Sequence, residues 1–272
     1  MRYARFDQGV ETRLGVVSDG RIQPLRVSSL QQVIDGAAIE PDGGSLDLAE
    51  VHLRAPLRPG KVIAVGLNYM DHCREQGIQP PSEPLLFSKF PTSVIGPGEE
   101  VRWPRGLTTQ ADYEVELGVI IGQTLRGIRE DDALDAVFGY TCVNDVTARD
   151  LQHGDGQWTR AKGMDSFCPI GPFVVSTDEV PDVQNLKLVC RVNGQVMQDS
   201  STGEMVFPVK KLLAHISQAI TLEPGDLVLT GTPHGVGMYH DPPVYLKPGD
   251  IMEVEVGDFG VLRNPVGEEL IF

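Results

Sequence analysis

Two glutamates, Glu114 and Glu116, stand two positions apart in the otherwise apolar run 113–121. The run predicts a strand, and because side chains alternate between the faces of a strand, both carboxylates lie on one face. Two like charges side by side repel each other and are costly to bury unless a cation lies between them. The alternative is a solvent-facing acidic pair on an edge strand.

A third carboxylate, Asp145, follows Asn144 at the end of another apolar run, 138–143. A side chain at the end of a strand can project into a cleft, where it would join Glu114 and Glu116. Three carboxylates with no nearby Cys or His form a hard oxygen-ligand set, which suits Mg²⁺ or Mn²⁺, with Ca²⁺ as a substitute. Taken alone, Asp145 equally suits a turn or the cap of a helix.

His72 and Glu75 form a second pair, in a segment that runs from a strand into a short helix. Residues three apart on a helix share a face, so Glu75 can hold one imidazole nitrogen while the other accepts a proton. This is the arrangement of a general base with its supporting acid. A surface ion pair is the alternative. Cys73 is not expected to act as a nucleophile with His72, because adjacent helical side chains point about 100° apart.

Lys162 stands between small residues and precedes the apolar segment 167–172. A lone lysine is commonly a solvated surface charge. In a metal-binding cleft, its ammonium group would stabilise a developing enolate or oxyanion.

The elements that would position these residues divide at about residue 59. Residues 1–58 predict a small α+β domain, with strands at 13–18 and 21–27 around the turn Asp19-Gly20 and a short helix capped by Ser28 or Ser29. Residues 56–60 predict a linker. Residues 59–272 form the second predicted domain, which would carry all the candidate residues.

The second domain shows many short apolar runs broken by Gly and Pro, with few helical windows. Strands are predicted at 62–65, 113–121, 138–143, 173–176, 186–192, 227–230 and 252–256. Asn193-Gly194 predicts a hairpin, and helices are predicted at 69–76, 130–137 and 209–220. Strands without regular βαβ alternation favour a closed or folded-over, β-rich α+β architecture over a doubly wound sheet. The segment 231–237 has the wrong glycine spacing for a dinucleotide site and predicts a tight turn.

Composition excludes several classes of protein. With 23 Lys plus Arg against 38 Asp plus Glu, the net charge of −15 disfavours nucleic acid and anionic lipid as partners. No run resembles a signal peptide or a membrane span, so a cytoplasmic location is expected. The four cysteines are widely spaced without a Cys-x-x-Cys pair, which predicts reduced, buried thiols rather than zinc or redox chemistry.

Six motifs in a fixed order resemble the fumarylacetoacetate hydrolase family from about residue 60 to the C-terminus. They are Asn68-Tyr69-x-x-His72-x-x-Glu75, Phe87-Ser88-Lys89-Phe90-Pro91-Thr92-Ser93, Tyr113-Glu114-x-Glu116-Leu117, Asn144-Asp145-x-Thr147-Ala148-Arg149-Asp150-x-Gln152, Lys162-Gly163 and Thr230-Gly231-Thr232-Pro233-x-Gly235-Val236-Gly237. The resemblance implies a catalytic domain of rolled mixed β-sheets, a small and variable N-terminal domain, and a homodimer.

The resemblance also implies roles for individual residues. The metal ligands are implied to be Glu114, Glu116 and Asp145, and the catalytic residues His72, Glu75 and Lys162. Contacts to the substrate carboxylate or nearby oxygens are implied for Tyr69, Arg149, Gln152 and Thr232.

The expected reaction is hydrolysis of a C–C bond in an acylpyruvate, which is a 2,4-dioxo acid. Substrate would chelate the metal through its carboxylate and C2 oxygen, and His72, oriented by Glu75, would activate a water at C4. The enolate of pyruvate would leave, stabilised by the metal and Lys162. Three alternatives stay open: an oxaloacetate decarboxylase, an isomerase of an unsaturated 2-hydroxy-diene-dioate, and a non-catalytic protein that uses the carboxylates as a structural cation site.

The acyl group of the substrate is not fixed by these residues. Segment 76–84 predicts a lid that orders when substrate closes the site. The loops 153–159 and 236–243 are expected to shape the distal pocket. Trp158, His234, Tyr239 and His240 are expected to pack within the protein rather than contact ligand.

Overall fold

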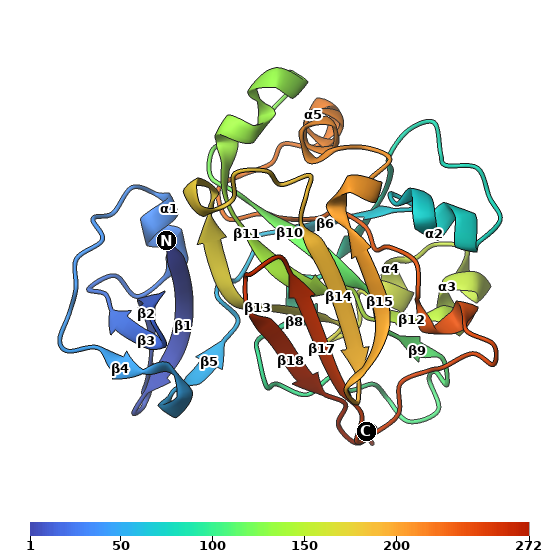
Figure 1. The fold of residues 1–272 in the computed structure, drawn as a ribbon, viewed down its shortest axis with the longest axis horizontal. Helices are drawn as coiled ribbons and strands as arrows, with labels where there is room; N and C mark the ends of the chain where they lie inside the picture. The colour runs from blue at the N-terminus through green and yellow to red at the C-terminus, as the bar shows by residue number, and fades with distance from the viewer. Residues whose placement is uncertain (272) are drawn as a thin grey trace.

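The computed structural model describes residues 1–271, and most of its strands form one large mixed sheet (Figure 1). The order in this sheet is β4-β3-β2-β1-β13-β11-β10-β16-β6-β7, with β5 paired to β1 and β8 to β13. Neighbours are antiparallel except for β16–β6 and β13–β8. Its strands are β1 (Arg2–Gln8), β2 (Glu11–Ser18), β3 (Arg21–Pro24), β4 (Leu46–Asp47), β5 (His52–Arg54), β6 (Val62–Gly66), β7 (Leu85–Lys89), β8 (Val94–Ile95), β10 (Val115–Ile121), β11 (Val137–Asn144), β13 (Cys168–Ser176) and β16 (Leu227–Leu229).

A second, four-stranded antiparallel sheet has the order β15-β14-β17-β18, and a short pair joins β9 to β12. Their strands are β15 (Gln195–Ser201), β14 (Lys187–Val192), β17 (Ile251–Val256), β18 (Val261–Pro265), β9 (Ala111–Asp112) and β12 (Thr147–Ala148). The helices are short: α1 (Leu30–Ile34), α2 (Met70–Glu75), α3 (Arg149–Asp155), α4 (Thr159–Lys162) and α5 (Val209–Ala219), with 3₁₀ turns at Leu48–Glu50, Pro91–Ser93, Glu130–Ala136, Thr177–Glu179, Thr202–Glu204 and Gly237–Tyr239. The predicted β-rich α+β fold is therefore confirmed.

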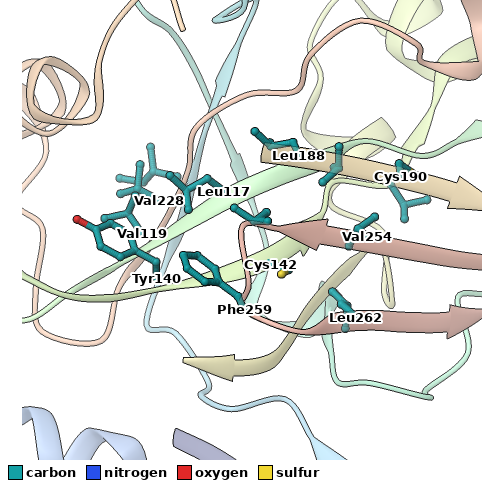
Figure 2. Close-up of a cluster of buried hydrophobic side chains, with 14 of the residues drawn as sticks. Leu117, Val119, Tyr140, Cys142, Leu188, Cys190, Val228, Val254, Phe259 and Leu262 are labelled. Carbon is teal, nitrogen blue, oxygen red and sulfur yellow. The ribbon is translucent and has the colours of Figure 1, made fainter. Parts of the chain in front are cut away.

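The main core lies between the two sheets. Leu117 and Val119 of β10 pack with residues of β14, β17 and β18, among them Leu188, Val254 and Leu262 (Figure 2). Ile120 points to the opposite face, into a second cluster. Because β10 is buried on both faces, its apolar residues are nearly continuous rather than alternating with polar ones. The two glutamates therefore interrupt a run that packing alone would keep apolar.

The N-terminal unit continues the large sheet. β1 pairs with β13 through Arg2 opposite Val175 and Tyr3 opposite Val174. Tyr3, Leu14 and Leu30 share a hydrophobic cluster with apolar residues of β6, β13 and β16. This unit lies on one side of the molecule, and α2, α3 and α4 gather on the opposite side (Figure 1). The domain boundary near residue 59 stays a prediction.

The two predicted tight turns have the backbone that their sequences favour. Asn193 and Gly194 both have positive φ, 52° and 80°, and they connect β14 to β15. Asp19 and Gly20 do the same between β2 and β3, with φ of 51° and 72°. Two successive positive φ values match the right-handed twist of the paired strands. Both hairpins are confirmed.

Three predicted elements differ from the structure. Segment 130–137 is a 3₁₀ helix over Glu130–Ala136 rather than an α-helix; its buried residues, Ala133 and Ala136, are three apart, a spacing that both helix types allow over one turn. Strand β13 begins at Cys168, five residues before the predicted start: Pro172 lies where the register with β11 shifts, and Pro169 stands opposite Ile95 of the short strand β8. Strand β10 begins only at Val115, so Glu114 precedes it.

All four cysteines are buried and unpaired. Within residues 1–271, no helix combines the length and the apolar character needed to cross a bilayer. The cytoplasmic location stays a prediction.

A pair of neighbouring residues on β18 tests the core. Leu262 is buried between the sheets, whereas Val261 is 46% exposed. Leu262→Ala is expected to lower the free energy of unfolding by about 2–5 kcal/mol, because it removes packed methyl groups and leaves a cavity. The control, Val261→Ala, is expected to cost less than about 1 kcal/mol. Urea unfolding measures both, and equal costs would contradict the described core.

Candidate active site

The carboxylate cluster lies where two neighbouring strands end. Val115 of β10 pairs with Asn144 of β11, so Glu114 and Asp145 stand side by side just beyond the pairing. Two hydrogen bonds fix this end: Asp145 N–H donates to the Glu114 carbonyl (2.9 Å), and Glu114 N–H donates to Asn144 Oδ1 (2.9 Å). One carboxylate oxygen from each of Glu114, Glu116 and Asp145 lies within 4.8 Å of the others, and all three residues are buried.

Cationic side chains surround two of these three carboxylates. Lys162 Nζ, on α4, donates to Glu114 Oε2 (2.7 Å) and Asp145 Oδ2 (2.8 Å). Lys89, at the end of β7, pairs with Asp145 and donates to the Lys162 carbonyl. Arg149 Nη2 lies 2.7 Å from Glu114 Oε1. Glu116 differs: among the described residues, its only hydrogen-bond donor is the backbone N–H of Gly231 (2.7 Å).

The pKa values of the two glutamates shift in opposite directions. Burial opposes ionisation of Glu114, but Lys162 and Arg149 outweigh it and hold its pKa below the ordinary value. For Glu116, burial together with Asp145 and Glu114 raises the pKa well above the ordinary value. A divalent cation would relieve the repulsion and supply the counter-charge that Glu116 lacks. The donor set, oxygen only and buried, fits such an ion.

The His72–Glu75 pair lies on α2. His72 Nδ1 is 2.8 Å from Glu75 Oε2, and Glu75 Oε1 accepts the backbone N–H of Gly235 (2.8 Å). An ionised carboxylate only accepts hydrogen bonds, so the Nδ1 position carries the proton and Nε2 keeps its lone pair. His72 lines the cavity that also holds Glu114 and Glu116. The structure thus brings the His72 imidazole into the same cavity as the carboxylates of Glu114 and Glu116.

The segment 231–237 is more than the predicted tight turn. Its backbone N–H groups hold three carboxylates: Gly231 donates to Glu116, Gly235 to Glu75, and Gly237 to Asp112 Oδ1 (2.8 Å). Gly235 has φ of +93°, and a Cβ there would lie 2.2 Å from a backbone oxygen of Met197. The glycines therefore allow the backbone to approach the acidic groups closely.

The cavity has a volume of about 130 Å³. Its charged side is formed by Glu114, Glu116, Lys162 and Arg149, and its apolar wall includes Phe87, Trp158, Met238 and Tyr239. Phe87 and Trp158 meet edge to face, with ring centroids 5.5 Å apart. Trp158 and Tyr239 thus line the cavity, contrary to the expectation that they only pack. His234 and His240 instead bond within the protein, to Asp71 and to Tyr113 and the Gly235 carbonyl.

Of the predicted substrate contacts, Arg149, Gln152 and Thr232 line the cavity and Tyr69 does not. Contact of Tyr69 with a substrate therefore stays a prediction. Tyr69 is extended and pairs with Met205 just before α2 begins, which turns its side chain into the core. Burial and the nearby Glu116 raise its pKa well above the ordinary value.

Two buried charged residues of the site were missed in the sequence. Asp112 Oδ2 accepts from Arg149 Nε (2.8 Å) and so ties α3 to the segment 231–237. Lys89 provides the second cation beside Asp145. In both cases the sequence shows a charged residue at the border of an apolar run, which suggests a buried charge. The sequence does not show which residue of opposite charge pairs with it.

Comparisons with known proteins place the chain in a family. The model described as "Fumarylacetoacetate (FAA) hydrolase C-terminal" matches residues 61–267, and "Rv2993c-like, N-terminal" matches residues 1–56. Bovine "Oxaloacetate tautomerase FAHD2A, mitochondrial" is 48% identical over 224 residues, covering 81% of this chain and 71% of that protein. The "2,4-didehydro-3-deoxy-L-rhamnonate hydrolase" of Sphingomonas sp. (strain SKA58) is 44% identical, covering 98% of this chain and 96% of that protein.

Solved structures agree with the sequence matches. A fumarylacetoacetate hydrolase from Exiguobacterium antarcticum superposes with a TM-score of 0.90 at 40% identity, covering 98% of this chain and 99% of that one. A 2-hydroxyhepta-2,4-diene-1,7-dioate isomerase from Mycobacterium marinum gives a TM-score of 0.84 at 34% identity, with 98% of each chain covered. This chain belongs to the fumarylacetoacetate hydrolase family of enzymes.

Proposed function

We propose that this chain is a divalent-metal-dependent hydrolase that cleaves a C–C bond in a small acylpyruvate. The observation that supports the proposal is the single cavity lined by His72, which Glu75 holds from behind, and by Glu114 and Glu116 of the carboxylate cluster. A structural cation site would need no oriented base beside it. This arrangement therefore favours catalysis over the non-catalytic alternative.

Glu114, Glu116 and Asp145 would hold Mg²⁺ or Mn²⁺. A cation bound there would supply Lewis acidity and neutralise charge on the carboxylate and C2 oxygen of a 2-oxo acid. Gln152 is suited to the substrate carboxylate, because its Oε1 accepts from Arg149 Nη1 (3.0 Å) and its NH₂ group is left for a ligand. The Lys162 ammonium has three N–H donors, of which Glu114 and Asp145 use two.

In the proposed reaction, His72 Nε2 takes a proton from a water that attacks the C4 carbonyl of the substrate. Glu75 stabilises the imidazolium that forms. Collapse of the C4 adduct breaks the C3–C4 bond, and the bonding electrons leave with the pyruvate enolate, toward which Lys162 directs its remaining N–H. The proton held on His72 then returns to C3, so the products are a carboxylic acid and pyruvate.

The Sphingomonas relative supports this substrate class. Its name describes an acid oxidised at C2 and at C4, the pattern of an acylpyruvate, and a hydrolytic activity. It matches this chain along nearly its full length, including the N-terminal unit.

A second candidate is the interconversion of keto and enol forms of oxaloacetate. Relatives with up to 48% identity are named oxaloacetate tautomerases. This reaction moves a proton at C3 and needs no attacking water, so the same base and cation would suffice. A decarboxylase or an isomerase would share the enolate. The homodimer also stays a prediction, which light scattering of the purified protein would test.

Removing Glu116 is expected to abolish the metal site. Glu116→Ala should weaken Mn²⁺ binding at least about 100-fold, because one of three oxygen ligands is lost from a buried cluster. Titration of the chelated protein with Mn²⁺, followed by electron paramagnetic resonance, measures the affinity. Glu100→Ala is the control, since Glu100 pairs with Arg102 at the surface. Unchanged affinity in Glu116→Ala would show that the ligand assignment is wrong.

Removing His72 is expected to impair the reaction but leave metal binding intact. His72→Ala should lower kcat for acetylpyruvate about 10²–10⁴-fold, because the general base is lost, while Mn²⁺ affinity stays within about twofold. The ultraviolet enol band of the substrate reports turnover. His52→Ala is the control, because His52 is an exposed residue of β5 in the N-terminal unit and does not line the cavity.

Parallel assays with oxaloacetate distinguish the two candidates. Rapid keto–enol conversion of oxaloacetate by the wild type without acylpyruvate hydrolysis would favour the tautomerase. An absence of turnover on every 2-oxo and 2,4-dioxo acid, with Mg²⁺ or Mn²⁺ present, would refute both.

A further inference from the structure

The helix that carries the His72–Glu75 pair, α2, is too short to be stable without contacts to the rest of the protein. α2 has six residues, and Tyr69, at its N-cap, makes no side-chain capping hydrogen bond. Isolated helices of this length are unstable in water, because the first turn costs more conformational entropy than its hydrogen bonds return. The position of His72 over the cavity must therefore come from contacts between α2 and the rest of the protein.

Asp71 makes the densest set of such contacts. Its Oδ1 accepts the backbone N–H of His72 (2.7 Å). Its Oδ2 accepts from Ser200 Oγ (2.5 Å) and lies 2.8 Å from His234 Nδ1. Ser200 belongs to β15 and His234 to the segment 231–237, so one carboxylate joins α2 to two separate elements. None of Asp71, Ser200 and His234 lines the cavity.

We propose that Asp71 is a positioning residue, which with Ser200 and His234 latches α2 in the orientation that places His72 over the cavity. The catalytic consequence of this latch rests on the proposed function. Asp71 and Glu75 are four residues apart on either side of His72, and they bond to two successive residues, His234 and Gly235. The helix is thus held at both ends by the same short segment.

The other contact of α2 with a charged partner is weaker. Arg74 pairs with Glu204 of the 3₁₀ turn Thr202–Glu204, but both side chains are exposed, and exposed ion pairs contribute little. The side chain of Asp71 is only 11% exposed, so water competes poorly for its hydrogen bonds. Loss of Ser200 and His234 would leave the Glu75–Gly235 bond as the remaining link to segment 231–237. The metal ligands stand on β10 and beside β11 and would keep their geometry.

Hydrogen exchange tests the latch directly. The amides of Cys73 and Gln76 donate to the carbonyls of Tyr69 and His72, so their exchange reports opening of α2. Ser200→Ala and His234→Ala, singly and together, remove the partners and leave Asp71 and the helix sequence intact. The double variant is expected to exchange these amides at least about 10-fold faster, with β10 amides and Mn²⁺ affinity unchanged.

Two further variants separate the latch from general destabilisation. Ser200→Thr keeps the hydroxyl group that donates to Asp71. The α2 amides of this variant should therefore exchange as slowly as in the wild type, unlike those of Ser200→Ala. His52→Ala removes an exposed histidine of β5, in the N-terminal unit, and should leave α2 exchange at the wild-type rate. For a substrate that the wild type turns over, kcat/KM of the double variant should fall at least about 10-fold.

The outcomes distinguish the two proposals. Unchanged exchange of α2 in the double variant would overturn the latch, whatever the activity. Faster exchange with unchanged kcat/KM would overturn the positioning role. Faster exchange, in a protein whose wild type turns over no 2-oxo acid, would support the latch and refute the proposed function.

Discussion

The repulsion among three buried carboxylates is the constraint on which the rest of the site depends. One carboxylate oxygen from each of Glu114, Glu116 and Asp145 lies within 4.8 Å of the others, in a part of the protein where uncompensated charge is costly. Lys162, Lys89 and Arg149 compensate this charge by contacting both oxygens of Glu114 and both oxygens of Asp145. Within residues 1–271, Glu116 accepts only the backbone N–H of Gly231. The compensation is therefore asymmetric, and the missing charge lies on the side that faces the cavity.

The segment 231–237 connects this cluster to the base. One continuous backbone donates to Glu116 at its start, to Glu75 in the middle and to Asp112 at its end. Glu116 of the carboxylate cluster, Glu75 of the His72–Glu75 pair and Asp112, which anchors Arg149, thus depend on the same few peptide units. A displacement of this backbone would disturb all three together. This explains why side chains from strands far apart in sequence can keep a fixed mutual geometry without a large helical scaffold.

The positions of the three carboxylates of the cluster could largely be predicted from strand periodicity and strand ends. The two-residue spacing of Glu114 and Glu116 and the place of Asp145 after an apolar run follow local rules, and the structure brings all three together. The His72–Glu75 contact follows from helical spacing in the same way. Nothing local distinguished Tyr69 from a cavity residue, because the direction of its side chain is set by pairing with Met205, more than 130 positions away.

The same limit explains the residues that were missed. Lys89 and Asp112 acquire their partners only through the sheet order, which brings β7 and the β9–β12 pair to one end of the molecule. Sequence patterns predicted about half of the strands, and not this order. The 3₁₀ helix at Glu130–Ala136 was misread because i,i+3 spacing is shared by both helix types over a single turn.

The junction of β1 with β13 gives the N-terminal unit a role apart from chemistry. Without β1, the edge of β13 at Val174 and Val175 would present bare peptide groups beside an apolar surface, and such edges invite association with other chains. The N-terminal unit therefore covers an exposed edge of the large sheet with β1. If another N-terminal unit replaced it, that unit would need a strand that pairs with β13 in the same place.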